Sequence, residues 1–160
     1  MAQTRLSSKD ITVISYLRSD ARRSLTKMSK VTGIPVSTIF DLIQKNKALV
    51  ITKFTALLDF GVLGFATRAS ITIKVDRQDR DILQEYLLRH HSINSVFKIT
   101  GGYDYLVEGI FQKIKEVDDF IDGLQSRFKG IEIRSYFIID DIKKEAFLTD
   151  PSLIPPSLQN

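Results

Sequence analysis

The chain has 160 residues, of which 43% are hydrophobic and 26% charged, and it contains no cysteine. These proportions are typical of a globular protein with one ordinary domain or two small ones. They exclude disulfides, thiolate metal sites and a thiol nucleophile, and no apolar run is long enough to span a membrane. Because the N-terminus also shows no secretion signal, we expect a cytoplasmic protein.

The net charge of +4 is distributed unevenly along the chain. Residues 1–53 carry ten Lys and Arg against three Asp, a net charge of +7, whereas residues 54–160 carry a net charge of −3. A basic N-terminal part favours a polyanion as its partner. A solvated basic surface is the alternative that charge alone leaves open.

The first 50 residues show the patterns of three short helices. Residues 7–10 (Ser-Ser-Lys-Asp) form a capping signal for a helix that stops at residues 19–20. Ser24 can cap a second helix that ends at Gly33, and Pro35 suits the first turn of a third. The inward residues of the three helices are expected to be Ile11, Ile14 and Leu17, then Leu25, Met28 and Val31, then Ile39, Leu42 and Ile43.

A four-residue turn at residues 32–35 makes the second and third helices a helix-turn-helix pattern, winged-helix-like in type. In this pattern the third helix enters the major groove of DNA, and basic residues around it contact phosphates. A plain three-helix bundle is the alternative interpretation. The candidate DNA-binding residues are Arg22, Arg23, Lys27, Ser37, Thr38, Gln44, Lys45 and Lys47.

Residues 50–58 predict a strand or an extended linker, and the turn residues at 59–64 mark a domain boundary. Beyond it, apolar alternation and helical periodicity predict the order βαββαβ, a ferredoxin-like arrangement in an α+β protein. The expected elements are strand 66–75, helix 79–90, strands 95–99 and 106–111, helix 113–128 and strand 131–140, followed by an extended tail at 151–157.

The two helices of this part carry apolar stripes, and several strands are apolar on both faces. The expected inward residues are Ile82, Leu83, Tyr86 and Leu87 in the first helix, and Ile114, Val117, Ile121, Leu124 and Phe128 in the second. Both helices of a ferredoxin-like fold cover the same face of the sheet. An apolar second face therefore predicts a partner, and we expect a second copy of the chain.

Residues 100–105 (Thr-Gly-Gly-Tyr-Asp-Tyr) join two apolar strands as a β-hairpin, because glycine supplies the positive φ that such turns need. The turn either only reverses the chain or also holds a small polar ligand. Backbone N–H groups at the glycines can receive a carboxylate, and Asp104 can receive an ammonium group. The alternatives are turn capping for Asp104 and interface packing for Tyr103.

Taken together, these residues resemble the Lrp/AsnC family, the leucine-responsive and feast/famine transcription regulators. The similarity rests on residues 6–17, 31–34 and 50–51, on the hinge at 58–64, and above all on residues 100–106, which are similar to the family signature T-G-x-Y-D-Y-L. The resemblance implies a DNA-binding domain, a linking strand, and an effector-sensing domain that dimerises and often forms octamers.

The resemblance also implies a division of the chain and a set of effector contacts. The parts are a helix-turn-helix domain at 1–52, a linking strand and hinge at 53–64, a ligand-sensing and oligomerisation domain at 65–145, and an extended tail at 146–160. Amino acids or related metabolites bind near the hairpin in this family. The implied effector-binding residues are Gly101, Gly102, Tyr103, Asp104 and Ser135, whereas Asp118, Asp119 and Asp122 are expected on a solvated face.

Three departures from the family pattern concern the helix-turn-helix. Asp41 and Leu42 stand where relatives usually carry Arg, Leu49 replaces a Gly, and residues 44–48 are about one residue short. Asp41 repels phosphate, although it can accept a hydrogen bond from a cytosine amino group. The alternative function is therefore a metabolite-sensing oligomeric subunit with weak or lost DNA binding.

An enzyme is the remaining function class, since some relatives with this architecture decarboxylate sirohaem. The two histidines, His90 and His91, are adjacent at the end of a predicted helix. On a helix they would point about 100° apart and form no shared metal pair. Because the sequence also offers no convincing nucleophile and base, we predict no catalysis, no cofactor and no metal site.

Overall fold

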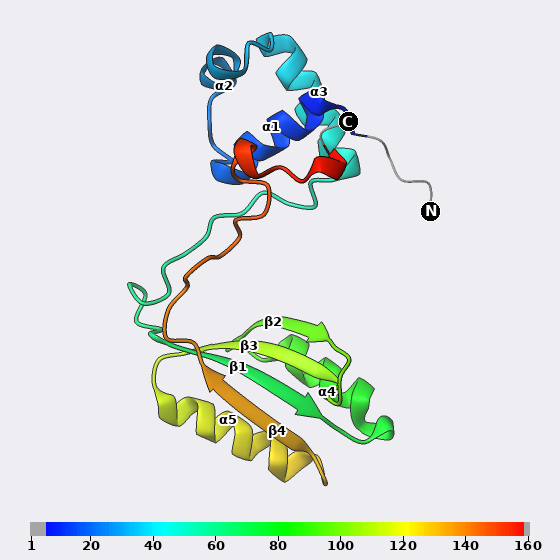
Figure 1. Cartoon of the computed structure of the whole chain (residues 1–160). Coiled ribbons are helices and arrows are strands. Elements are labelled where there is room, and N and C mark those ends of the chain that lie inside the picture. The colour runs from blue at the N-terminus through cyan, green and yellow to red at the C-terminus, as the bar shows by residue number, and fades with distance from the viewer. Residues whose placement is uncertain (1–5, 159–160) are drawn as a thin grey trace. The chain divides into compact units, whose positions relative to one another are not determined.

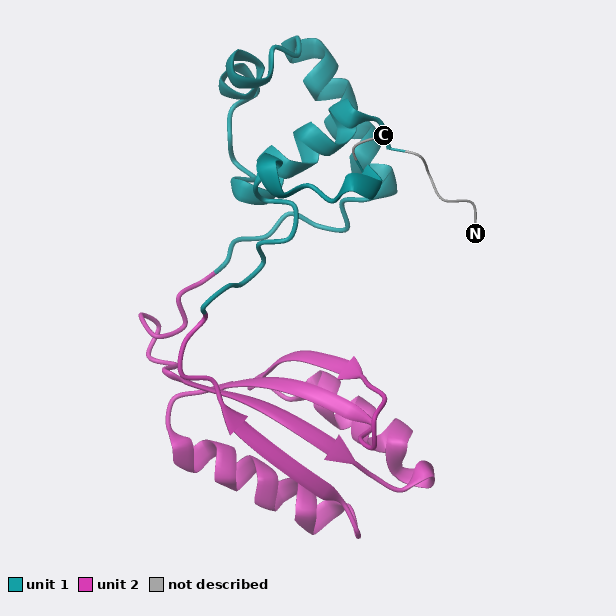
Figure 2. Ribbon diagram, in the orientation of Figure 1, with its two compact units in different colours: residues 1–57, 142–160 teal, residues 58–141 magenta. Residues whose placement is uncertain are grey.

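The computed structural model describes residues 6–158. The chain divides into two compact units, which Figure 2 colours separately. The helical unit comprises the described parts of residues 1–57 and 142–160, and the sheet unit comprises residues 58–141. The four-part division expected from the sequence remains a prediction about functional domains. No helix among residues 6–158 is long and apolar enough to cross a membrane.

The helical unit contains α1 (Ser8–Ser19), α2 (Leu25–Thr32) and α3 (Val36–Leu49), shown in Figure 1. The predicted caps are confirmed: the Ser7 hydroxyl accepts from the Asp10 N–H, and the Asp10 carboxylate accepts from the Ser7 N–H. Gly33 ends α2 with φ of +72°, a conformation that favours glycine. Residues 51–58, expected as strand or extended linker, contain no regular element.

The core of the helical unit is small. Val13, Met28, Ile34 and Ile39 form one cluster of buried apolar side chains, and Ile11 and Ile14 of α1 are also buried, as predicted. Leu25, Leu42 and Ile43 pack partly buried against this cluster, as predicted. The prediction for Val31 was wrong, because 65% of this side chain is exposed. Each three-residue step turns about 300°, so Val31 has rotated away from the face that Leu25 and Met28 share.

The sheet unit has the predicted βαββαβ order, and its strands pair antiparallel in the order β2-β3-β1-β4 (Figure 1). Antiparallel pairing in this order identifies the sheet as ferredoxin-like. Its elements are β1 (Thr67–Lys74), α4 (Arg80–Arg89) after a short 3-10 turn at Arg77–Asp79, β2 (Ile93–Lys98), β3 (Tyr105–Phe111), α5 (Ile114–Arg127) and β4 (Glu132–Phe137).

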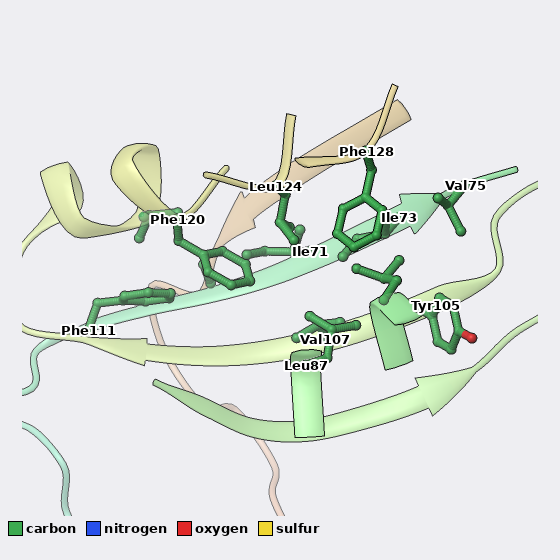
Figure 3. Close-up of a cluster of buried hydrophobic side chains, with 13 residues drawn as sticks. Ile71, Ile73, Val75, Leu87, Tyr105, Val107, Phe111, Phe120, Leu124 and Phe128 are labelled. Atoms are coloured by element: carbon green, nitrogen blue, oxygen red, sulfur yellow. The ribbon is translucent and has the colours of Figure 1, made fainter. Parts of the chain in front are cut away.

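Both helices cover the same face of this sheet, where 13 buried apolar side chains form the core. Figure 3 shows Leu87 of α4 and Leu124 of α5 meeting Ile71 and Val107 of the central strands. The predictions of Ile82 and Ile114 as inward residues were wrong, because these side chains are 61% and 59% exposed. On α5 the buried stripe instead includes Phe120, three residues after Val117 and four before Leu124.

The other face of the sheet is mixed rather than apolar throughout. Residues paired directly across strands share a face, and the central strand β1 presents only polar residues there. These are Arg68, Ser70, Thr72 and Lys74, and the apolar residues of the same face are Phe97, Leu106, Ile110 and Tyr136. Phe97 and Tyr136 remain 53% and 56% exposed. We call this side the open face.

The tail is ordered against the helical unit, contrary to the expected extended segment. Residues Pro151–Leu153 and Pro156–Leu158 form two 3-10 turns. Each begins with proline, which lacks a backbone N–H, and the first residue of a helical turn makes no intrahelical hydrogen bond through that group. The Arg18 guanidinium of α1 donates to the backbone oxygens of Glu145 (2.9 Å) and Phe147 (3.1 Å) and pairs with the Glu145 carboxylate (3.2 Å).

Candidate nucleic-acid interface and effector hairpin

A buried carboxylate fixes α3 on α1. The Asp10 side chain is fully enclosed and accepts from the Lys45 ammonium (2.9 Å) and the Asn46 amide (2.8 Å), both on α3. Burial alone would raise the pKa of Asp10, but hydrogen bonds from Ser7, Lys45 and Asn46 outweigh it and hold this pKa well below its usual value. Lys45 therefore has a structural partner, and its contact with DNA remains a prediction.

Around the start of α2 the helical unit has a hollow of about 590 Å³, which we call the basic hollow. Its lining residues are Asp20, Arg22, Arg23, Ser24, Lys27, Lys30 and Val31. Among the described residues, Arg22, Lys27 and Lys30 form no ion pair with a carboxylate. The Asp20 carboxylate accepts instead from the Arg22 N–H at 2.9 Å. The hollow therefore offers unpaired cations to an anion.

The structure brings three of the predicted DNA-binding residues together in the basic hollow, namely Arg22, Arg23 and Lys27. Arg23 also stacks on the Tyr16 ring, 5.0 Å from its centroid. Sequence reasoning missed Lys30 as a member of this cluster. Its position three residues after Lys27 on a predicted helix was the available signal, because such residues share a helix side.

The remaining predicted residues lie on α3. Ser37 and Gln44 are exposed and Thr38 is partly buried. Lys47 is exposed in the last turn, with its ammonium 5.7 Å from the centroid of the Phe54 ring. Sequence reasoning missed Phe40, which is 51% exposed on this helix. Its position outside the apolar stripe of Ile39, Leu42 and Ile43 could have indicated this exposure.

The hairpin turn places two consecutive glycines in left-handed conformations. Gly101 has φ of +95° and Gly102 has φ of +101°, so any other residue there would be strained. Both are exposed, and within the described chain neither backbone N–H donates a hydrogen bond. The turn thus presents open donors of the kind that receive a carboxylate.

Asp104 anchors this turn to the rest of the sheet unit. One carboxylate oxygen accepts from the Val75 N–H at 3.0 Å, and the other lies 2.7 Å from the Arg80 guanidinium. The Asp104 N–H donates to the Ile73 oxygen at 2.9 Å. The Asp104 carboxylate therefore contacts Val75 and Arg80, outside the turn, and effector binding by Asp104 remains a prediction. Arg80, which sequence reasoning missed, is half-exposed beside the turn and adds a cation to it.

The other two effector candidates lie differently. Tyr103 is partly buried, and the Arg134 guanidinium lies 5.7 Å from the centroid of its ring. Ser135 is exposed on β4 and pairs with Ile71 of β1. Tyr105, the first residue of β3 after the turn, pairs with Ile73, so Ser135 lies two positions along β1 from the end near the turn. The structure therefore keeps Tyr103 in the turn but does not bring Ser135 to it. Effector contact by either residue remains a prediction.

The histidine pair differs from the geometry expected on a helix. Because α4 ends at Arg89, His91 lies beyond it, and the two imidazoles stack with centroids 4.8 Å apart. Burial against Phe120 and Tyr86, and the neighbouring His91, lower the pKa of His90. Within residues 6–158 no group of three or more His, Asp or Glu side chains could hold a metal ion. Asp118, Asp119 and Asp122 are exposed.

The profile of the Lrp/AsnC ligand-binding domain matches residues 68–147, which include the sheet unit's hairpin. The HTH-type transcriptional regulator FL11 of Pyrococcus horikoshii is 32% identical over 137 residues, covering 85% of this chain and 90% of that protein. The chain belongs to the Lrp/AsnC family. Its tail beyond residue 147 lies outside the matched segment.

Solved structures of Lrp/AsnC-type regulators share this fold. A transcriptional regulator of Neisseria meningitidis (NMB0573), solved as an L-methionine complex, superimposes with a TM-score of 0.80 at 20% identity and covers 87% of this chain and 93% of its own. The feast or famine regulatory protein Rv3291c of M. tuberculosis, also complexed with L-methionine, gives a TM-score of 0.72 at 16% identity, over 86% and 96% of the two chains.

Proposed function

We propose that this Lrp/AsnC protein is an oligomeric, sequence-specific DNA-binding transcription regulator whose activity is modulated by an amino acid or a related metabolite. The observation that carries the proposal is the set of unpaired cations at the basic hollow, next to a helix-turn-helix. Phosphates are the natural partner of such cations. The relationship to FL11, an HTH-type transcriptional regulator, supports the same conclusion.

DNA binding is tested by titrating the full-length protein against duplex DNA at increasing salt. We expect affinity to fall linearly on a log–log plot, with a slope proportional to the number of contacted phosphates. Replacing both Arg22 and Lys27 by Ala should reduce that slope by about two phosphates. Lys113→Ala with Lys115→Ala, two exposed cations of the sheet unit, is the matched control. Absence of duplex binding at low salt would contradict the proposal.

For the effector, we place the carboxylate of an α-amino acid at the Gly101 and Gly102 N–H groups, with Arg80 beside them. This site is supported by the open donors and by the half-exposed guanidinium. Asp104 already has two partners, so it acts through the turn rather than as the free acceptor of an ammonium group. The complexes of two family members with L-methionine make that amino acid the first probe.

Isothermal titration with L-methionine, then with the other amino acids, tests the effector site. Gly102→Ala strains a φ of +101° and should weaken binding without filling occupied space. Gly123→Ala, in the middle of α5 with open space around it, is the matched control. Unchanged affinity in Gly102→Ala would exclude the hairpin as the effector site.

The open face is the surface that we assign to dimerisation. Its exposed rings, Phe97 and Tyr136, stand on opposite edge strands of the sheet, and apolar area on a sheet face favours burial by a second copy. Light scattering of Phe97→Glu with Tyr136→Glu tests this assignment, since charges there should give monomers. A tetramer or octamer built from such dimers would lose mass in the same experiment.

A sensing subunit with weak DNA binding is the second candidate. The observation that favours it is Asp41, a carboxylate exposed on α3 without an ion-pair partner in the described chain. Under this hypothesis Asp41→Arg strengthens duplex binding by relieving repulsion from phosphates. A nanomolar wild-type affinity at physiological salt would count against it.

A further inference from the structure

The outward side of α3 carries an uncovered aromatic ring in a polar stripe. Phe40 is 51% exposed, although its neighbour Ile39 is fully buried. Ser37, Asp41 and Gln44 are exposed at helical spacing around it. We call these four residues the α3 stripe. In a helix-turn-helix this stripe is the part of the protein that meets base edges.

The α3 stripe has no group that reads guanine. Guanine is recognised most often by Arg or Lys donating to its O6 and N7 atoms. The sequence of α3 contains no Arg, and the Lys45 ammonium lies 2.9 Å from the buried Asp10 carboxylate. Lys47 lies in the last turn of α3, over the Phe54 ring. The uncharged and acidic side chains of the α3 stripe are therefore the groups available to contact base edges directly.

The groups that remain match the other base edges. A glutamine amide forms two hydrogen bonds with adenine, a carboxylate accepts from the cytosine amino group, and an apolar ring contacts the thymine methyl group. Gln44, Asp41 and Phe40 supply these three groups on adjacent turns of one helix. The carboxylate also fixes which part of DNA lies there, because Asp41 is repelled by the phosphate backbone but not by a base edge.

We infer that the α3 stripe selects half-sites rich in A·T pairs, in which Phe40 packs on a thymine methyl group and Asp41 accepts from a cytosine. This inference rests on the proposed DNA binding and names what that binding recognises. The occupant is duplex DNA, because the same unit carries the unpaired cations of the basic hollow. A thymine methyl group lying against the uncovered ring removes apolar surface from water, which is favourable.

The test begins with selection of bound duplexes from a randomised pool by the full-length protein. Each thymine of the selected site is then replaced by deoxyuridine, which lacks only the 5-methyl group. At one position in each half-site the wild-type affinity should fall about fourfold, the effect of losing one buried apolar carbon. In Phe40→Ala the same replacement should leave the affinity unchanged.

Leu153→Ala is the matched control, because Leu153 is an apolar residue of the helical unit that is 68% exposed outside α3. It should keep the full deoxyuridine effect. A deoxyuridine effect that persists in Phe40→Ala, or is absent from the wild type on a selected site, overturns the inference and leaves DNA binding standing. If Phe40→Ala changes the oligomeric mass but leaves the base preference unaltered, the ring makes a contact with another protein copy. That result would also overturn the inference.

Asp41 provides a separate measurement. Asp41→Arg should change the preferred base at one position from cytosine to guanine, since arginine donates to guanine where a carboxylate accepts from cytosine. The same selection on this variant reads the change directly. An unaltered base preference would remove Asp41 from the readout. If the wild type binds no duplex even at low salt, both the inference and the proposed function are wrong.

Discussion

The two compact units are stabilised by different means. In the sheet unit 13 buried apolar side chains form one cluster between two helices and one sheet face, whereas six apolar side chains are buried among the described residues of the helical unit. The helical unit adds polar ties, the Asp10 carboxylate between α1 and α3 and the Arg18 guanidinium on the tail. A small core supplemented by polar ties leaves more of the surface for charged groups, which suits a unit that we propose to bind DNA.

The largest effect should come from the core of the sheet unit. Leu87→Ala removes a fully buried side chain of α4, and a cavity of this kind costs about 2–5 kcal/mol of unfolding free energy. The adjacent Leu88 is 67% exposed, so Leu88→Ala is the matched control. Hydrogen exchange of β3 amides measures the stability of this unit. Equal losses in the two variants would contradict the burial difference.

The stability of the helical unit should depend on the buried charge as well as on its apolar core. Asp10→Asn places an amide donor against the Lys45 and Asn46 donors, and we expect a loss of about 1–3 kcal/mol in the unfolding free energy. Urea unfolding of the variant, compared with the surface control Asp41→Asn, measures the effect. No difference between these variants would mean that the core alone holds α3 on α1.

The Asp10 network also predicts a pH dependence. The native pKa of Asp10 lies below the ordinary value of 3.8, so its stabilisation is fully present above that pH and is lost as the pH falls below it. The stability difference between wild type and Asp10→Asn should therefore shrink between about pH 5 and pH 2. Unfolding curves of both proteins across that interval measure the change, and a constant difference would contradict the assignment.

A smaller effect is expected at the tail. Arg18→Ala removes donors to two backbone oxygens, and the partly exposed site limits the cost to about 1 kcal/mol. Hydrogen exchange within residues 142–158 should rise, while exchange in the sheet unit stays unchanged. Arg22→Ala, which removes an exposed cation that has no carboxylate partner within residues 6–158, is the control. If the tail amides stayed equally protected in Arg18→Ala, the Arg18 contacts would not be what holds the tail on α1.

The smallest effect should come from a surface ion pair of the sheet unit. The Lys74 ammonium lies 2.6 Å from the Glu132 carboxylate, but both side chains are at least half exposed. Water and salt screen such a pair, so Glu132→Gln should leave the unfolding midpoint unchanged. Glu108→Gln, which breaks the more enclosed pair with Arg68 at 2.8 Å, should lower it measurably. Equal shifts of the unfolding midpoint in the two variants would show that burial of an ion pair does not change its contribution to stability in this unit.

The order of elements followed from local patterns. Caps at Ser7 and Ser24, the turn at Gly33 and the apolar periodicities predicted three helices and a βαββαβ unit, and the structure has both. These signals depend on neighbouring residues within a few turns, so they are legible in a single chain. The same periodicity failed for Val31, Ile82 and Ile114, because helix ends and exact facing depend on what packs against them.

The sites were predicted less completely. Residues 100–104 located the hairpin that we propose as the effector site, but the contacts of Asp104 with Val75 and Arg80 join positions 24 to 29 residues apart. Likewise the charge pattern made Lys45 a candidate for phosphate contact but did not show its ion pair with Asp10, 35 residues earlier. A charge pattern reports how many cations a segment has. It does not report which of them the fold has already paired.

The sequence by itself therefore determined the element order, the basic character of the helical unit and the position of the hairpin turn. Only the tertiary structure determined which cations remain unpaired at the basic hollow. It also determined the contacts through which Asp104 anchors the turn and the packing of the tail on α1 through Arg18. The physical reason is range. Caps, turns and periodicity act between near neighbours, whereas burial and ion pairing join residues that only the folded chain brings together.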